Sequence, residues 1–136
     1  LDSCLHYVES FQTDRKILRK ILVDGKFAGT YSAELDIENG VATCGMLVGV
    51  QFAGQGIGLL AWKTGMSELF ELKTLRKIKA GTAASNLAMQ KIFLRTGMEM
   101  EAVLQKDLII NGESENLLLF AIHKESYSLA LEYSDN

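Results

Sequence analysis

The sequence predicts an α+β domain of three layers, in which a mixed, mostly antiparallel sheet carries helices on both faces. Three observations favour this fold class. Short apolar runs near both ends of the chain flank Asp-Gly and Asn-Gly pairs, which are typical of tight β-hairpins. Two stretches in the middle repeat their apolar residues at helical spacing. The runs and stretches follow one another in the order β-β-β-α-β-α-β-β, which fits one sheet with helices packed on it.

The length and the charge of the chain exclude several function classes. The 136 residues are enough for one hydrophobic core, so residues 1–136 are expected to form a single domain. A net charge of −3, from 14 basic and 17 acidic side chains, argues against a nucleic-acid partner. The longest apolar run, residues 117–122, is far shorter than the ~20 residues that cross a bilayer, and no export signal is recognised. We therefore expect no nucleic acid, no membrane and a cytoplasmic location.

The first elements are predicted from periodicity and turn residues. Residues 1–11 carry apolar side chains three and four positions apart, which indicates the end of an amphipathic helix. Because no start signal precedes this helix, the chain is expected to be cut from a longer protein. Three strands follow, at residues 16–23, 26–35 and 41–50, with Asp24-Gly25 and Asn39-Gly40 between them.

The remaining elements are read in the same way. Apolar residues from Ile57 to Leu72 predict a helix of about four turns. A short strand at 77–82 and a helix at 85–95 come next, and Gly97 is suited to a left-handed helix cap. The last hairpin consists of residues 98–110 and 115–123 around Asn111-Gly112, and residues 124–136 are expected to be a polar tail without firm structure.

The most informative segment is a glycine-rich junction between the third strand and the next helix. Gly54-Gln55-Gly56-Ile57-Gly58 leaves the backbone bare where the first N–H groups of a helix have no partner, which suits a phosphate or pyrophosphate group. A tight turn without any ligand is the alternative. The segment is not the GxGxxG dinucleotide fingerprint, and Lys63-Thr64 lies too far inside the helix for a P-loop.

The same residues resemble motif A of the GCN5-related N-acetyltransferase (GNAT) superfamily, in which a Val and a spacer precede Gly-x-Gly-Ile-Gly at a helix start. Val48 occupies the upstream position. Further along, residues 77–82 resemble the next strand of that family, and the segment from Asn86 to Met98 resembles its pattern of Asn, a small residue, Tyr and then Gly-Phe. The resemblance runs in element order from Lys16 to His123 and implies a GNAT-like acyl-CoA N-acyltransferase fold. It also implies that the chain lacks the N-terminal strand and first helix of that fold.

The resemblance also implies a cosubstrate and a reaction. Acetyl-CoA would bind with its pyrophosphate on backbone amides of the glycine loop, and an amine of a small molecule or peptide would attack the thioester directly. No metal is implied. The residues that match the cofactor-binding positions of the family are Val48, Val50, Gly54, Gln55, Gly56, Ile57, Gly58 and Asn86.

The sequence departs from the family pattern where catalysis is concerned. Ala53 stands where Arg or Gln commonly precedes the first glycine, unless Gln51 serves in a register shifted by two residues. Phe93 stands where many relatives have the Tyr that protonates the CoA thiolate. Either water or another group would do so, or the step needs little help because a thiolate is a good leaving group, and a Phe93→Tyr change is expected to be tolerated. Glu34 and His123 are the candidates for a general base, and direct proton loss to water is the alternative.

Two functions therefore follow from the sequence. The first is an acetyl-CoA-dependent N-acetyltransferase, and the second is a non-catalytic acyl-CoA-binding or interaction module with the same fold. Acids of the last hairpin, Asp107, Glu113 and Glu115, would favour a cationic amine if they faced the site. Family members often form homodimers. Cys4 and Cys44 are too few and too far apart for a disulfide scaffold or a metal site, so both are expected to be reduced thiols.

Overall fold

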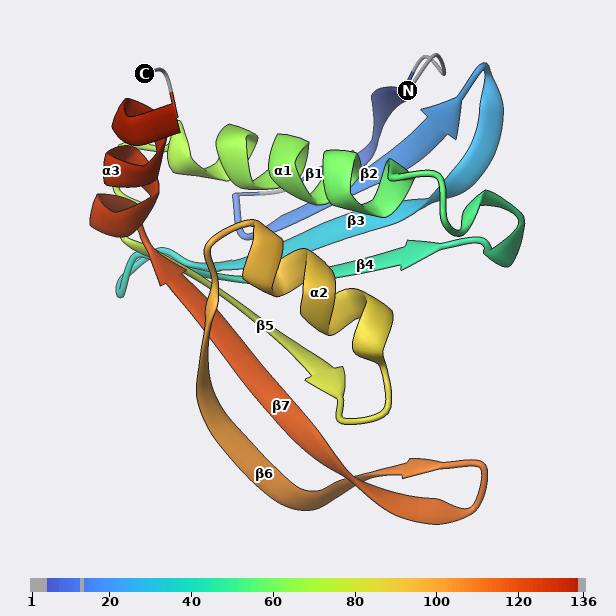
Figure 1. The fold of residues 1–136 in the computed structure, drawn as a ribbon. Helices are drawn as coiled ribbons and strands as arrows, with labels where there is room; N and C mark the ends of the chain where they lie inside the picture. The colour runs from blue at the N-terminus through green and yellow to red at the C-terminus, as the bar shows by residue number, and fades with distance from the viewer. Residues whose placement is uncertain (1–4, 13, 135–136) are drawn as a thin grey trace.

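A computed structural model of the protein describes residues 5–12 and 14–134, and its seven described strands form one sheet (Figure 1). The strand order is β1-β2-β3-β4-β5-β7-β6, in which β4 and β5 are the parallel pair and the other neighbours are antiparallel. The predicted mixed, mostly antiparallel sheet is therefore confirmed. The elements are β1 (Leu5–Gln12), β2 (Lys16–Val23), β3 (Lys26–Asp36), β4 (Val41–Val48), the 3₁₀ helix η1 (Val50–Phe52), α1 (Ile57–Phe70), β5 (Lys77–Ala83), α2 (Leu87–Arg95), β6 (Glu99–Ile110), β7 (Glu113–His123) and α3 (Lys124–Ser134).

Two of the predicted hairpin turns have the expected geometry. Asp24 and Gly25 have φ angles of 52° and 80°, and Asn111 and Gly112 have the same pair of values, as a two-residue type I′ turn requires. The connection between β3 and β4 is longer. There, the Asp36 carboxylate accepts hydrogen bonds from the backbone and side-chain N–H groups of Asn39, and Gly40 alone of that loop has a positive φ.

The core lies between the sheet and the helices. Trp62 of α1 is 1% exposed, and its ring centroid lies 5.5 Å from that of Tyr31 on β3 and 5.2 Å from that of Phe93 on α2. Phe93 in turn packs 5.0 Å from Phe120 of β7. Helix α1 lies so close to β3 that a Cβ atom on Gly65 would be 2.3 Å from the Tyr31 ring, so glycine is required at this crossing.

The described helices all cover the same face of the sheet (Figure 1). Helices α1 and α2 share the aromatic contacts above, and Tyr127 of α3 packs 4.7 Å from Phe70 at the end of α1. The expectation of helices on both faces is therefore wrong for residues 5–12 and 14–134. We call the side without described helices the open face, and it carries Lys16, Glu34, Thr43 and Lys79 as exposed side chains in register on β2 to β5.

The two ends of the chain also differ from expectation. The predicted helix at residues 1–11 is wrong, because Leu5–Gln12 forms β1 and pairs antiparallel with β2 from Leu5↔Val23 to Gln12↔Ile17. The first four residues of that prediction, and Cys4 with them, lie outside the described residues. The polar tail forms α3, which the Tyr127 contact holds against the core. None of the helices in the described ranges is long and apolar enough to span a bilayer.

Candidate active site

The site begins where two parallel strands separate. Strands β4 and β5 pair from Val41↔Lys77 to Cys44↔Ala80 and no further, although β4 continues to Val48 and β5 to Ala83. Figure 1 shows the two strands diverging beyond this point. Parallel strands that stop pairing leave backbone donors and acceptors exposed along both inner edges. A slot therefore opens in the middle of the sheet.

The edge of β4 that faces this slot can be assigned from one hydrogen bond. Gly49 donates its N–H to the carbonyl oxygen of Ala28 on β3, at 2.8 Å. Successive residues of a strand direct their backbone groups to opposite sides, so Val48 and Met46 direct theirs away from β3 and toward the slot. The predicted strand at 41–50 is two residues too long, because Val50–Phe52 turns into η1. Val50 is 89% exposed there and has left the edge of the slot.

The glycine loop presents the start of α1 to the same space. Gly54 and Gly56 have φ angles of 76° and 74°, a conformation that side chains other than glycine rarely adopt. Gly56 is the N-cap of α1, no side chain caps the helix, and its first turn contains no acid. The first N–H groups of the helix are therefore available to an anion, and the positive end of the helix dipole adds to that preference.

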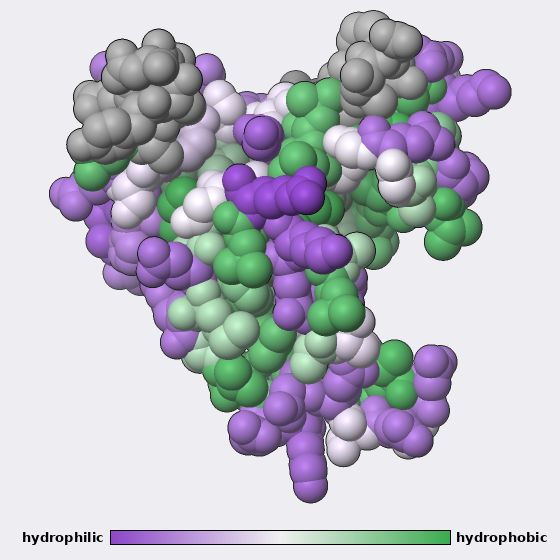
Figure 2. Space-filling view, in the orientation of Figure 1, coloured by the Kyte–Doolittle hydropathy of each residue, from purple (hydrophilic) through white to green (hydrophobic). Residues whose placement is uncertain are grey.

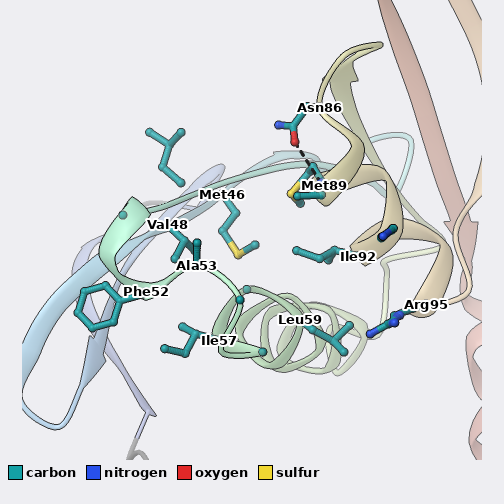
Figure 3. A pocket seen from close by; sticks show the side chains of 17 residues that line it. Met46, Val48, Phe52, Ala53, Ile57, Leu59, Asn86, Met89, Ile92 and Arg95 are labelled. Atoms are coloured by element: carbon teal, nitrogen blue, oxygen red, sulfur yellow. Dashed lines mark hydrogen bonds between the residues drawn. The ribbon is translucent and has the colours of Figure 1, made fainter.

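A cavity of about 450 Å³ lies between this loop and α2 (Figure 3). Figure 2 shows the surface hollowed on the same side of the molecule, between the loop after β4 and the hairpin of β6 and β7. Most of the cavity wall is apolar, and Met46 and Ile92 point into the cavity from opposite sides. The cavity is lined by Met46, Leu47, Val48, Gly49, Phe52, Ala53, Gly54, Gly56, Ile57, Gly58, Leu59, Asn86, Ala88, Met89, Lys91, Ile92 and Arg95.

Most of the predicted cofactor-binding residues meet at this cavity. Val48, Gly54, Gly56, Ile57, Gly58 and Asn86 line it. Val50 and Gln55 do not, and the Gln55 side-chain amide instead donates to the Gln51 carbonyl at 3.4 Å. Asn86 is the N-cap of α2, where its side-chain oxygen accepts from the Met89 N–H at 3.1 Å (Figure 3).

Two lining cations were not singled out from the sequence. Lys91 and Arg95 are both exposed on α2 and stand four residues apart, so they share one face of that helix. In Figure 3 the Arg95 guanidinium reaches toward Leu59 of α1. The i, i+4 spacing was visible in the sequence, but the direction of that face depended on how α2 packs against the sheet.

The two candidate bases lie in a different place. Glu34 and His123 both line a second hollow, of about 730 Å³, on the open face. Thr43, Lys77 and Lys79 line it as well. Lys77 donates to Glu101 at 2.7 Å, and this hydrogen bond holds the pKa of the Glu101 carboxyl below its ordinary value. The structure places Glu34 and His123 on one hollow but on strands three positions apart in the sheet, β3 and β7, and on the face away from the helices.

Phe93, Cys44 and Glu115 line neither the cavity nor the hollow on the open face. Phe93 is 1% exposed and does not line the cavity. Cys44 is a free thiol in the core, and burial raises its pKa to about 12, so it is a neutral apolar side chain. The Glu115 carboxylate accepts the N–H of Ser85 ahead of α2. No group of three His, Cys, Asp or Glu side chains in residues 5–12 and 14–134 is placed to hold a metal ion.

Comparison with solved structures identifies similar folds. A probable acetyltransferase is 26% identical with a TM-score of 0.78, and the match covers 82% of this chain and 64% of that one. A RimL ribosomal L7/L12 alpha-N-protein acetyltransferase in complex with coenzyme A is 19% identical with a TM-score of 0.76, covering 80% and 62%. A spermidine N-acetyltransferase from Vibrio cholerae in complex with CoA and spermine is 17% identical with a TM-score of 0.78, covering 85% and 69%.

The chain thus spans less than two thirds of the length of the first two of these proteins. No curated protein sequence gave a significant match. The Acetyltransferase (GNAT) family matches residues 2–98, which is more than half of the chain and includes the separating strands, the glycine loop and α2. The chain belongs to the GNAT acetyltransferase family.

Proposed function

We propose that this chain is an acetyl-CoA-dependent N-acetyltransferase that acetylates a primary amine of a small molecule or a peptide. One observation carries the proposal: an uncapped helix N-terminus behind a glycine loop opens onto an apolar slot between strands that have stopped pairing. This arrangement offers donors for a pyrophosphate beside a narrow channel for a flexible thiol arm. Two of the three solved structures compared above hold CoA, as their names state.

The residues of the glycine loop fit a pyrophosphate in shape as well as in charge. A Cβ atom on Gly54 or Gly56 would meet nothing within 4 Å, so the space beside the loop is open to a ligand. The backbone N–H groups of Gly54, Gln55, Gly56, Ile57 and Gly58 would hold the phosphate oxygens. Lys91 and Arg95 add cations at the rim. They supply positive charge at a site where Ala53 replaces the basic or amide side chain of many relatives.

The inner edge of β4 would hold the pantetheine arm. Met46 and Val48 direct backbone groups into the slot and would pair with the amides of the arm, a role that Val50 cannot share because it lies in η1. Met89 and Ile92 would cover the arm from α2. Bound acetyl-CoA would supply an activated thioester, and the geometry favours its position near Cys44↔Ala80, where the strands begin to separate.

The proton chemistry must come from outside the cavity. The described residues that line the cavity include no carboxylate and no imidazole, the groups that most often act as general bases. Glu34 and His123 remain the proposed bases, acting from the open face or through water. Phe93 has no proton to donate, so water would protonate the departing thiolate.

Calorimetry tests the proposal most directly. Acetyl-CoA and CoA are titrated into the chain, and thiol release is then followed with a panel of amines. Binding of both nucleotides and amine-dependent thiol release are the expected results. The absence of binding to either nucleotide would exclude the proposal.

A non-catalytic acyl-CoA-binding module is the second candidate, and the lack of a base or acid among the described cavity residues favours it. The two candidates differ in turnover. Thiol release with any amine, lost in a folded Gly56→Glu variant, excludes the module. Tight acetyl-CoA binding without release across the whole panel excludes the enzyme.

A further inference from the structure

The hollow on the open face has a fixed position relative to the slot. We call it the open-face hollow, and Glu34, Thr43 and Lys79 lie in register across it on β3, β4 and β5. The pair Thr43↔Lys79 immediately precedes Cys44↔Ala80, the last pair before the strands separate. One residue of a strand advances about 3.3 Å, so the hollow ends where the slot begins.

Two glycines lie between the hollow and the slot. Gly45 and Gly81 are the next residues after the last pair on β4 and β5. A Cβ atom on Gly45 would lie 3.4 Å from the Ser32 hydroxyl oxygen, and one on Gly81 would lie 3.1 Å from Leu117 and 3.2 Å from Leu119, so both glycines face the open side and the two leucines of β7 lie beside Gly81. At this step, β4 and β5 therefore place no side chain between an amine in the hollow and a thioester in the slot.

Most charged groups around the hollow already have partners. Arg15 forms a two-point pair with Glu38, and Lys77 pairs with Glu101 at 2.7 Å. Arg76 donates twice to the Asn39 carbonyl oxygen, and Asp36 accepts from Asn39. These groups shape the rim of the hollow and have little capacity left for a ligand.

Glu34 and Lys79 differ from these groups. Among the described residues, no hydrogen bond or ion pair is formed by the Glu34 carboxylate or by the Lys79 ammonium group. Adjacent strands are about 4.8 Å apart, so the two Cα atoms are about 10 Å apart with the smaller Thr43 between them. A carboxylate with Lys16 as its cross-strand neighbour, and an ammonium group that interacts electrostatically with Glu101, thus flank a hydroxyl beside Gly45 and Gly81. This pattern is complementary to a zwitterion.

We propose that the acceptor is a zwitterionic amine of the free amino-acid type, with its ammonium group at Glu34 and its carboxylate at Lys79. This inference rests on the proposed function. Glu34 removes one proton from the ammonium group, and the freed nitrogen lone pair forms a C–N bond to the acetyl carbon. The C–S bond breaks, its electron pair stays on the thiolate, and a water molecule protonates that thiolate and takes up the second amine proton. The products are an N-acetyl amino acid and CoA thiol, with the first proton passed to water.

An acceptor panel tests the proposal. Thiol release is measured with acetyl-CoA and each of the twenty common amino acids, their α-amides and putrescine. The amides keep the amine and lose the carboxylate, so the best amino acid should exceed its amide in kcat/KM by at least about tenfold, the usual value of a charge-assisted hydrogen bond. Putrescine should be poorer still. A preference for amides or putrescine would overturn the inference while leaving acetyl transfer intact.

Two variants with the same charge change make the test specific. Lys79→Gln should remove the preference for the amino acid over its amide, and Lys79→Arg should keep it. Lys63→Gln removes the same charge on the exposed side of α1 and is the matched control. It should change kcat/KM for neither the amino acid nor its amide. Equal effects of Lys79→Gln and Lys63→Gln would contradict the assignment.

A binding measurement separates this inference from the proposed function. Amide and side-chain NMR signals of Thr43 and Lys79 are followed in CoA-loaded protein as the amino acid or its amide is added. Selective shifts with the amino acid support the site even if turnover is slow. No shift at Thr43 or Lys79 with any amino acid overturns the inference, whereas failure to bind CoA overturns the proposed function.

Discussion

Near the point where β4 and β5 separate, the two faces of the sheet present different chemical groups to a ligand. On the helix face, the cavity consists of backbone N–H groups, a helix end and apolar side chains from Met46 to Gly58 and from Asn86 to Arg95. On the open face, the hollow is lined mostly by charged and polar side chains of β2, β3, β4, β5, β7 and their flanking loops, and also by the apolar side chains of Leu35 and Val41. A ligand that is always the same can be bound by backbone, whereas a ligand that varies between relatives is selected by side chains.

Because of this difference, the cavity and the hollow should respond differently to substitution. A site made from glycine backbone fails when a side chain is added, because the conformation and the open space are both lost. A site made from exposed side chains fails in chemistry or selectivity while the fold is retained. Substitutions on the two faces should therefore separate cofactor binding from turnover.

Gly56→Glu should have the largest effect. The residue has a φ of 74°, so any side chain is strained by about 1–2 kcal/mol, and a carboxylate at this N-cap would lie at the proposed phosphate site. We expect CoA affinity to fall roughly 10³-fold, which corresponds to about 4 kcal/mol. Calorimetry with CoA measures the change, and circular dichroism checks that the chain remains folded.

Gly112→Glu is the matched control for that variant. Gly112 has a φ of 80°, and a Cβ atom added there would meet nothing within 4 Å, so its strain is similar, but it lies at the tip of the last hairpin. Its CoA affinity should equal that of the unmodified chain. Similar losses of affinity in the two variants would show that backbone strain, and not the phosphate site, explains the effect.

Glu34→Gln should separate the two faces most clearly. Loss of a general base lowers turnover by about 10²-fold or more, but Glu34 does not line the cavity. We therefore expect a large fall in kcat with an unchanged Kd for CoA. Steady-state thiol release and calorimetry on the same preparation give both values, and His123→Gln tests the other candidate in the same hollow. If both variants turn over normally, water is the base.

The same contrast explains what could be predicted from sequence. The glycine loop and the hairpin turns are contiguous signals, so the proposed phosphate loop at Gly54 to Gly58 and the turn at Asn111-Gly112 could both be predicted. The hollow depends on register across five strands. Nothing local connects Glu34 with Lys79, which are 45 positions apart in the sequence and meet through β4.

The errors at the chain ends have related causes. Residues 1–11 contain apolar spacings that suit a helix, but pairing of Leu5–Gln12 with β2 supplies strand hydrogen bonds that no local pattern reveals. Residues 124–134 have a weak apolar pattern, and their helix is stabilised by packing of Tyr127 on Phe70. In both places, a tertiary contact decides the local structure.

Arg95→Glu should have a moderate effect on the cofactor side. Arg95 is exposed at the rim of the cavity, so reversing its charge should weaken CoA binding by about tenfold and hardly affect the hollow. The same variant should bind a pantetheine fragment without phosphates normally. Calorimetry with both ligands, repeated at high salt, should show the difference for CoA shrinking as charges are screened. A loss that is equal for both ligands would instead indicate a packing defect in α2.

Phe93→Tyr should have the smallest effect on activity, contrary to what its place in the family pattern suggests. Phe93 is 1% exposed between Trp62 and Phe120 and does not line the cavity, so a hydroxyl there is buried without a described partner. The change should therefore not be well tolerated: we expect a loss of about 1–3 kcal/mol in the free energy of unfolding, with kcat unchanged. Urea unfolding and thiol release measure the two quantities. A rise in kcat without loss of stability would mean that the hydroxyl reaches the slot, and that protonation of the thiolate limits turnover on the helix face after all.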